Sequence, residues 1–306
     1  MKRWGAWLLA SWLLGGVARA CPCSDEASSA SGLVREDERY AVALVATSRR
    51  ALGRFDALGR YRPLGDGEGE WSEELLLRAG LRLPRRLEWL GEIGSARYRL
   101  HAPGFIERQD GIGDALLRVR YSALDEAMPH EAVPLPAVSL SALLRAPLGV
   151  AASSGTGSFG SGGAQRGLGA WELGAGAELK RSLLPALELG LSGEAAYRFE
   201  DHALGPARRL GPRLEAALGA RLLPVDWLAS TIAIRLRTTA DVSLSGRSLE
   251  GTSERLWSVV LGAAVYERGS RLRSSVTLSV DPPLGSLSKG STAAAALGVS
   301  LAVGAL

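Results

Sequence analysis

Charged side chains at every second position are the feature of this sequence with the clearest chemical meaning. Glu172, Glu178 and Lys180 alternate with leucines and alanines, and Glu188 and Glu194 do the same in the next segment. Because successive side chains of a β-strand point to opposite faces, these charges are predicted to share one face of a strand and the apolar residues the other. Charges of opposite sign on neighbouring strands can pair, and rings of charged residues can select ions.

The polar face is predicted to line the interior of a closed sheet, where it meets water rather than lipid. An excess of arginine in the later segments indicates a preference for anions. A charge network that only holds a narrow barrel together is an equally weighted alternative. The predicted lining residues are Asp114, Arg118, Arg120, Glu172, Glu178, Lys180, Glu188, Glu194, Arg198, Arg213, Arg221, Arg235, Arg237, Arg271 and Arg273, with Glu74, Arg78, Arg145, Glu215 and Asp241 on the same face.

Twelve segments alternate in this way, and each is long enough to cross a bilayer, which takes about 9–11 tilted residues. The sequence therefore predicts an all-β fold: a single-domain transmembrane antiparallel β-barrel of about 12 strands. The stretch 51–62 also alternates and leaves 14 strands open, and a change of phase in 87–100 predicts a β-bulge near Gly94. The predicted strands are 39–50, 69–83, 87–100, 111–122, 135–146, 169–181, 185–199, 212–223, 226–243, 254–267, 271–281 and 292–306.

The lengths of the links favour a membrane barrel over a soluble sandwich. Links that would face the periplasm are mostly tight, whereas every external link is longer, including a predicted loop at 101–110. The tight links are predicted at 84–86, 184–185, 223–225 and 268–270. Aromatic residues of the apolar face gather at the ends of the segments, as expected at two water–lipid boundaries. They are Trp71, Trp89, Tyr121, Trp171, Phe199 and Trp257.

The first 20 residues have the layout of a cleaved secretory signal, with a basic start, an apolar run, and small residues at Ala18 and Ala20. We predict a signal peptide at 1–20, a periplasmic N-terminal segment at 21–37, and an outer-membrane β-barrel at 38–306. The predicted location is therefore the outer membrane of a Gram-negative cell.

Removal of the signal peptide would take away three of the 36 basic residues, so the basic composition gives little support to nucleic-acid binding. No nucleic-acid partner is expected. The expected partners are outer-membrane lipid and lipopolysaccharide, a small-molecule solute, and the barrel-assembly machinery during insertion.

Residues with metal-binding or catalytic chemistry are few. No metal site and no cofactor are predicted, although Cys21 and Cys23 are weak candidates for a soft metal, and Cys21 could instead carry a lipid. His101, His130 and His202 all fall in predicted links, where no serine is placed to pair with them. The sequence therefore predicts a protein that is not an enzyme.

Residues 110–121 (Asp-Gly-Ile-Gly-Asp-Ala-Leu-Leu-Arg-Val-Arg-Tyr) place a Gly-x-Gly-Asp turn before a strand with basic residues and a terminal aromatic. This segment resembles one that recurs in outer-membrane transporters of the MetA-pathway-of-phenol-degradation type. The resemblance covers only these residues, and it implies a β-barrel that moves small, aromatic compounds. In this chain Asp114, Arg118 and Arg120 would then face the lumen.

Together these features predict an outer-membrane barrel acting as a passive channel or transporter for small solutes, with aromatic or anionic solutes favoured. One alternative is a non-conducting structural barrel that displays external loops. A barrel hydrolase acting on lipids is the less favoured alternative.

Overall fold

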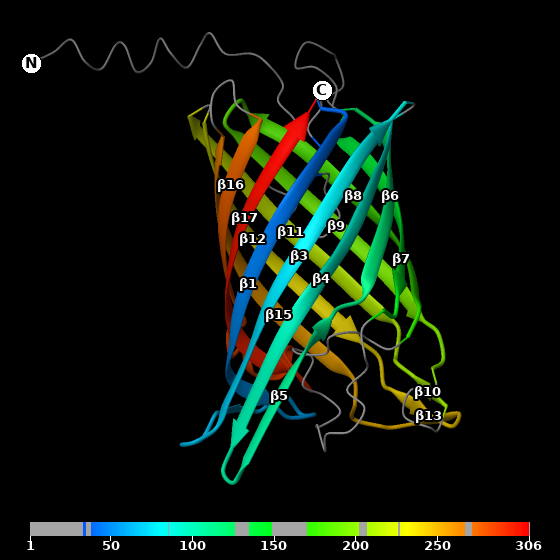
Figure 1. Cartoon of the computed structure of the whole chain (residues 1–306), viewed down its shortest axis with the longest axis vertical. Coiled ribbons are helices and arrows are strands. Elements are labelled where there is room, and N and C mark those ends of the chain that lie inside the picture. The colour runs from blue at the N-terminus through cyan, green and yellow to red at the C-terminus, as the bar shows by residue number, and fades with distance from the viewer. Residues whose placement is uncertain are drawn as a thin grey trace, which may run out of the picture.

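The computed structural model describes residues 33–34, 38–84, 86–125, 135–148, 170–201, 207–225, 227–266 and 271–305. Twelve long antiparallel strands form one closed barrel, in agreement with the predicted fold (Figure 1). These strands are β1 (Tyr40–Phe55), β3 (Gly69–Leu83), β4 (Leu87–Ala102), β6 (Ala115–Leu124), β7 (Ala137–Ala146), β8 (Glu172–Leu184), β9 (Leu187–Arg198), β11 (Arg213–Val225), β12 (Leu228–Thr239), β15 (Glu254–Tyr266), β16 (Leu272–Val280) and β17 (Thr292–Ala305).

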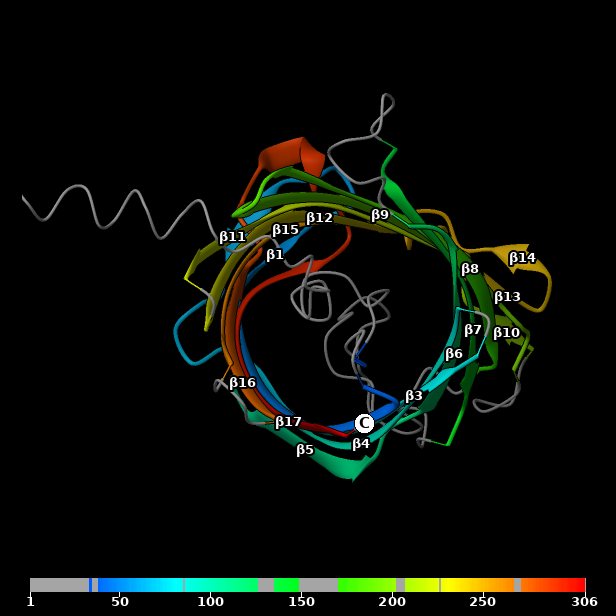
Figure 2. The same cartoon turned by 90° about the horizontal axis from the view of Figure 1, so that it is seen from above.

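Shorter elements lie at the end of the barrel away from the start of β1. The pair β10 (Arg208–Arg209) and β13 (Ser243–Leu244) forms a small sheet with β14 (Arg247–Ser248), which lies outside the ring of strands (Figure 2). The remaining elements are β2 (Tyr61–Pro63), β5 (Phe105–Ile112) and the 3-10 helix η1 (Gly285–Leu287).

The barrel closes where β1 pairs with β17, from Tyr40 opposite Ala305 to Arg54 opposite Thr292. Closure matters in lipid because backbone N–H and C=O groups at a free sheet edge would find no partner there. The alternative of 14 strands is wrong. Residues 51–55 extend β1, and β2 pairs only with the end of that strand instead of crossing the membrane.

Burial follows the alternation along each strand. Side chains such as Leu44, Leu191 and Leu218 are about half exposed on the outside, while their sequence neighbours are buried or half-buried on the inside. Outward-facing aromatics are found at both ends of the barrel, among them Trp171 at one end and Tyr121 at the other. An apolar outer belt between two aromatic girdles is the surface expected of a membrane barrel. In the described part of the chain, no helix is long and apolar enough to span a membrane.

Two predicted links have different positions in the structure. The link expected at 223–225 is the last part of β11, which ends at Val225 and whose pairing with β12 shifts register there. The external loop expected at 101–110 is a hairpin, in which β4 and β5 continue on either side of Pro103 and Gly104. Gly104 has φ 76°, a left-handed conformation that suits glycine after proline in a tight turn.

The bulge predicted near Gly94 is wrong for that strand, because β3 and β4 pair without any register shift from Gly69 to Leu83. The extra residue lies on the neighbouring chain segment, between β5 and β6. There the backbone N–H of Gly113 donates to the carbonyl of Gly94 at 2.8 Å. The apparent phase change of 87–100 has another cause. Alternation continues along β4, so Arg97 and Arg99 lie on the outer face, and they can be charged because this part of β4 extends beyond the apolar belt.

The outer belt can be tested with Leu218→Arg, which places a charge on the lipid side in the middle of β11. We expect the free energy of unfolding to fall by about 2–4 kcal/mol, the cost of an arginine at the midplane of a bilayer. Urea titration of the protein in lipid vesicles measures this change. The control Leu58→Arg alters an exposed leucine of an external link and should leave the unfolding midpoint unchanged.

Candidate functional site: the charged interior of the barrel

The largest ion-pair network inside the barrel is centred on Arg213 of β11. Its guanidinium lies 2.9 Å from the carboxylate of Glu172, 2.6 Å from that of Glu194 and 2.8 Å from that of Glu215. Glu172 is fully buried and also accepts from Arg198 at 2.9 Å. Shared carboxylates of this kind hold neighbouring strands in one arrangement, because each charge has several partners.

One arginine joins this network from a more distant strand, and two inward glycines of β8 lie between that strand and its partner. Arg118 starts on β6, yet its guanidinium reaches Glu194 on β9 at 2.7 Å, across β7 and β8. A Cβ at Gly174 would lie 3.0 Å from the side chain of Leu143, and one at Gly176 would lie 2.9 Å from the Ser141 hydroxyl. Side chains of β7 therefore pack close to the backbone of β8 at these two positions, where a larger inward residue would collide with them.

A second group of ion pairs continues the network toward the first strands. Arg120 contacts the carboxylate of Glu178 at 3.1 Å and that of Glu88 at 3.5 Å. Lys180 lies 3.2 Å from the same Glu178. Charges on β4, β6 and β8 are thus joined, and the Arg120–Glu178 pair links β6 to β8 across β7.

Two further arginines lie near the external ends of β11 and β12, where Glu215 and Glu254 are acids within their electrostatic reach. Arg235 shares Glu215 with Arg213, at 3.4 Å. Arg237, two residues further along β12, forms no ion pair with any residue that the structure describes. Among the predicted lining residues, Arg235 and Arg237 are therefore the best placed to act on a passing ion.

The wall formed by β15, β16, β17 and β1 differs from the charged wall. Its inward positions carry alanine, glycine, valine, serine and threonine, and its ion pairs lie at the ends: Arg49 with Asp281 at 3.5 Å, and Arg273 with Glu38 at 3.0 Å. The interior therefore has one charged side and one side of small apolar and hydroxyl groups. The inward residues of this second side are Ala41, Ala43, Val45, Thr47, Val260, Gly262, Ala264, Ser275, Thr277, Ser279, Ala294, Ala296, Gly298, Ser300 and Ala302.

The remaining predicted lining residues are spread along the barrel. Glu188 lies directly opposite Arg221 in the pairing of β9 with β11, and Arg221 is buried. Asp114 lies at the interruption between β5 and β6, whereas Arg271 is exposed just before β16 begins. As a channel lining, these residues remain a prediction.

Several inward acids were missed by the sequence reasoning. Glu88 and Glu92 of β4 belong to the interior, where Glu92 pairs with Arg78 at 2.7 Å. Strict alternation from Glu88 would have found both, but the assumed bulge near Gly94 obscured the phase of this strand. Asp281 ends the predicted strand 271–281 on the register of Arg271 and Arg273, so alternation alone would have found it; in the structure it follows the last residue of β16.

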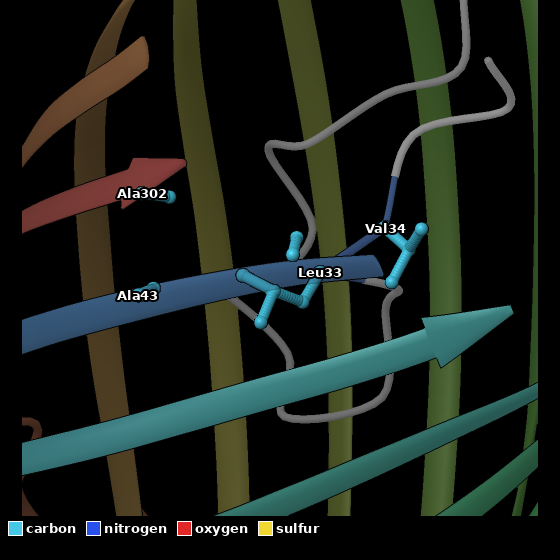
Figure 3. Close-up of a cluster of buried hydrophobic side chains, with 5 residues drawn as sticks. Leu33, Val34, Ala43 and Ala302 are labelled. Carbon is cyan, nitrogen blue, oxygen red and sulfur yellow. The ribbon is translucent and has the colours of Figure 1, made fainter. Parts of the chain in front are cut away.

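Leu33 and Val34 lie inside the barrel, near the end where β1 begins, and pack against Ala43 and Ala302 (Figure 3). Both backbone polar groups of Val34 form hydrogen bonds with side chains. Its N–H donates to Glu88 at 3.2 Å, and its carbonyl accepts from Arg82 at 3.0 Å. These two residues belong to the predicted N-terminal segment 21–37, and they occupy space next to the small-residue wall.

The candidate metal and catalytic residues are mostly outside the described part of the chain, which does not include Cys21, Cys23, His130 or His202. His101 is exposed near the end of β4. Within the described residues, no group of three or more potential ligands is arranged to hold a metal ion.

No protein-family model matches the chain, and no match is found among curated proteins. Among solved structures, the COG4313 outer membrane channel from Pseudomonas putida F1 has a TM-score of 0.68 at 13% identity, over 94% of this chain and 98% of that chain. The transport unit of the autotransporter AIDA-I from Escherichia coli has a TM-score of 0.50 at 8% identity, over 90% of this chain and 93% of that chain. At such identities the similarity shows the fold, and the β-barrel implied by residues 110–121 is confirmed.

The role of the Arg213 network can be tested with Arg213→Ala, which leaves Glu172 and Glu194 buried without their shared cation. We expect the free energy of unfolding to fall by about 3–5 kcal/mol, as is typical when one partner of a buried ion pair is removed. Urea titration in vesicles measures the change, with Arg209→Ala on exposed β10 as the matched control. Equal unfolding midpoints for the two variants would contradict a structural role for the network.

Proposed function

We propose that the protein is a passive channel for small solutes in the outer membrane. The observation that carries the proposal is a barrel with an apolar outer belt and charged inward side chains that keep access to solvent. The side chains of Arg145, Arg235 and Arg49 retain 30%, 23% and 21% exposure, so the described side chains do not fill the interior. The solute then moves down its own gradient, since nothing described here supplies energy.

The two unlike sides of the interior favour solutes that are themselves amphipathic. A small organic anion could place its charge near Arg235 and Arg237 and its apolar part against the alanines and glycines of the opposite side. Aromatic acids have this character. The shared carboxylates limit the preference, because most interior arginines already have an anionic partner.

The fold comparison supports a channel function, because the Pseudomonas putida protein is described as an outer membrane channel. Membership of the MetA-pathway-type transporter family, export through a cleaved signal peptide and the absence of enzymatic activity are further parts of this proposal.

A non-conducting structural barrel is the second candidate. The dense ion pairs around Arg213 favour it, as do Leu33 and Val34 inside one end of the barrel. Single-channel recording of the purified protein in a planar bilayer separates the two candidates. Discrete current steps support the channel, whereas folded, inserted protein that passes no current supports the structural barrel.

Ion preference can be tested with Arg235→Glu combined with Arg237→Glu. We expect the preference to change from anions to cations, because two positive charges near the external end of the lumen become negative. The reversal potential in a salt gradient measures this. Arg209→Glu combined with Arg247→Glu, on the small sheet outside the ring, is the control and should leave the reversal potential unchanged. Equal shifts for both variants would mean that surface charge alone sets the preference.

Whether Leu33 and Val34 narrow the lumen can be tested with Leu33→Ser combined with Val34→Ser. We expect conductance to rise, because smaller, polar side chains lose their packing against the alanines of β1 and β17. Leu58→Ser, in an exposed external link, is the control. Unchanged conductance in the double variant would show that these residues do not restrict the path.

A further inference from the structure

Two rows of side chains lie next to each other on the outer face of β1, β3, β4 and β5. The strand pairings place them in register near the external end of the barrel. The first row consists of Ser48, Glu73, Arg97 and Asp110. The second row, one step further from the start of β1, consists of Arg50, Trp71, Arg99 and Arg108.

The first row neutralises its own charge. Arg97 lies 3.1 Å from the carboxylate of Asp110 on one side and 3.7 Å from that of Glu73 on the other. One arginine between two acids leaves no positive charge available for an outside partner. This row shows that acidic residues on these strands can pair with an outward arginine where one is in register.

The second row has three arginines and no acid. Arg99 lies over the ring of Trp71, 5.7 Å from its centroid. Arg50 and Arg108 form no ion pair with any residue that the structure describes. Arg99 and Arg108 are directly opposite each other in the pairing of β4 with β5, an arrangement that costs free energy for like charges. An anion bound between them would offset this cost.

The position of the second row along the barrel indicates which anion it binds. Toward the apolar belt, the same outer face continues with Leu75, Leu77 and Ile93, which are exposed in the direction of lipid. Trp71 within the row is the type of residue that marks a water–lipid boundary. The three guanidinium groups are therefore at the level of lipid headgroups, and arginine binds phosphate oxygens with two parallel hydrogen bonds.

We propose that Arg50, Arg99 and Arg108 bind the phosphate groups of lipid A in the outer leaflet, with its acyl chains against Leu75 and Ile93. The proposal rests on the outer-membrane location proposed above. It assigns a specific lipid contact to one side of the barrel, centred on the β4–β5 hairpin, and it does not depend on whether the interior conducts.

The test is binding of diphosphorylated lipid A to the full-length protein in detergent, measured by native mass spectrometry. We expect the triple variant Arg50→Gln, Arg99→Gln, Arg108→Gln to bind about a hundredfold more weakly, because each arginine near an anionic lipid contributes about fivefold. The matched control changes Arg62, Arg209 and Arg247 to glutamine. These arginines are also exposed at the external end but lie outside the row, and the control should bind as the unchanged protein does.

Three outcomes would overturn the proposal. Equal losses in the two triple variants would mean general charge attraction, and equal binding of dephosphorylated lipid A would mean apolar contact alone. Displacement of lipid A by millimolar inorganic phosphate would indicate a simple anion site. Arg108 lies beyond the barrel wall, so the single variant Arg108→Gln should not disturb folding. We expect this variant to bind lipid A about fivefold more weakly. A bilayer recording without current, together with intact lipid A binding, would contradict only the channel.

Discussion

The hydrogen-bonded seam between β1 and β17 is the constraint on which the rest of this barrel depends. In the hydrocarbon region an open edge would leave a row of backbone groups without partners, so the first and last strands must meet. Their inward positions are small where they face each other, as in Ala43 opposite Ala302 and Thr47 opposite Gly298. Closing the ring at this register sets the stagger of the strands, and stagger and strand number together determine which charged side chains come within reach across the interior.

The positions of the membrane-crossing strands could be predicted well from the sequence, because lipid on one side and water on the other impose a strict alternation. Where both sides of a strand meet water, this signal is lost. Residues 101–110 show no alternation of apolar and polar residues, which predicts a loop, although they complete the hairpin of β4 and β5. The same loss of alternation moved the expected bulge to Gly94, on the wrong one of two neighbouring segments.

The partners within the interior could not be derived from strand phase alone. Alternation places Arg118 on the inner face, but only the structure shows that it reaches Glu194, three strands away in the sheet. Such contacts depend on the tilt and register of the strands and on the size of the side chains between the two partners. Glu172 illustrates the result: three arginines surround one carboxylate, so the interior combines many cations with little free positive charge.

The interruption at Gly113 and Asp114 has a consequence for how this molecule can change over time. It separates β5 from β6, so the hairpin beyond the membrane and the wall within it have independent registers. A residue gained or lost in the hairpin is absorbed at the interruption and does not turn the charges of β6 toward lipid. The hairpin of β4 and β5 can therefore change in length while the crossing strands keep their pattern.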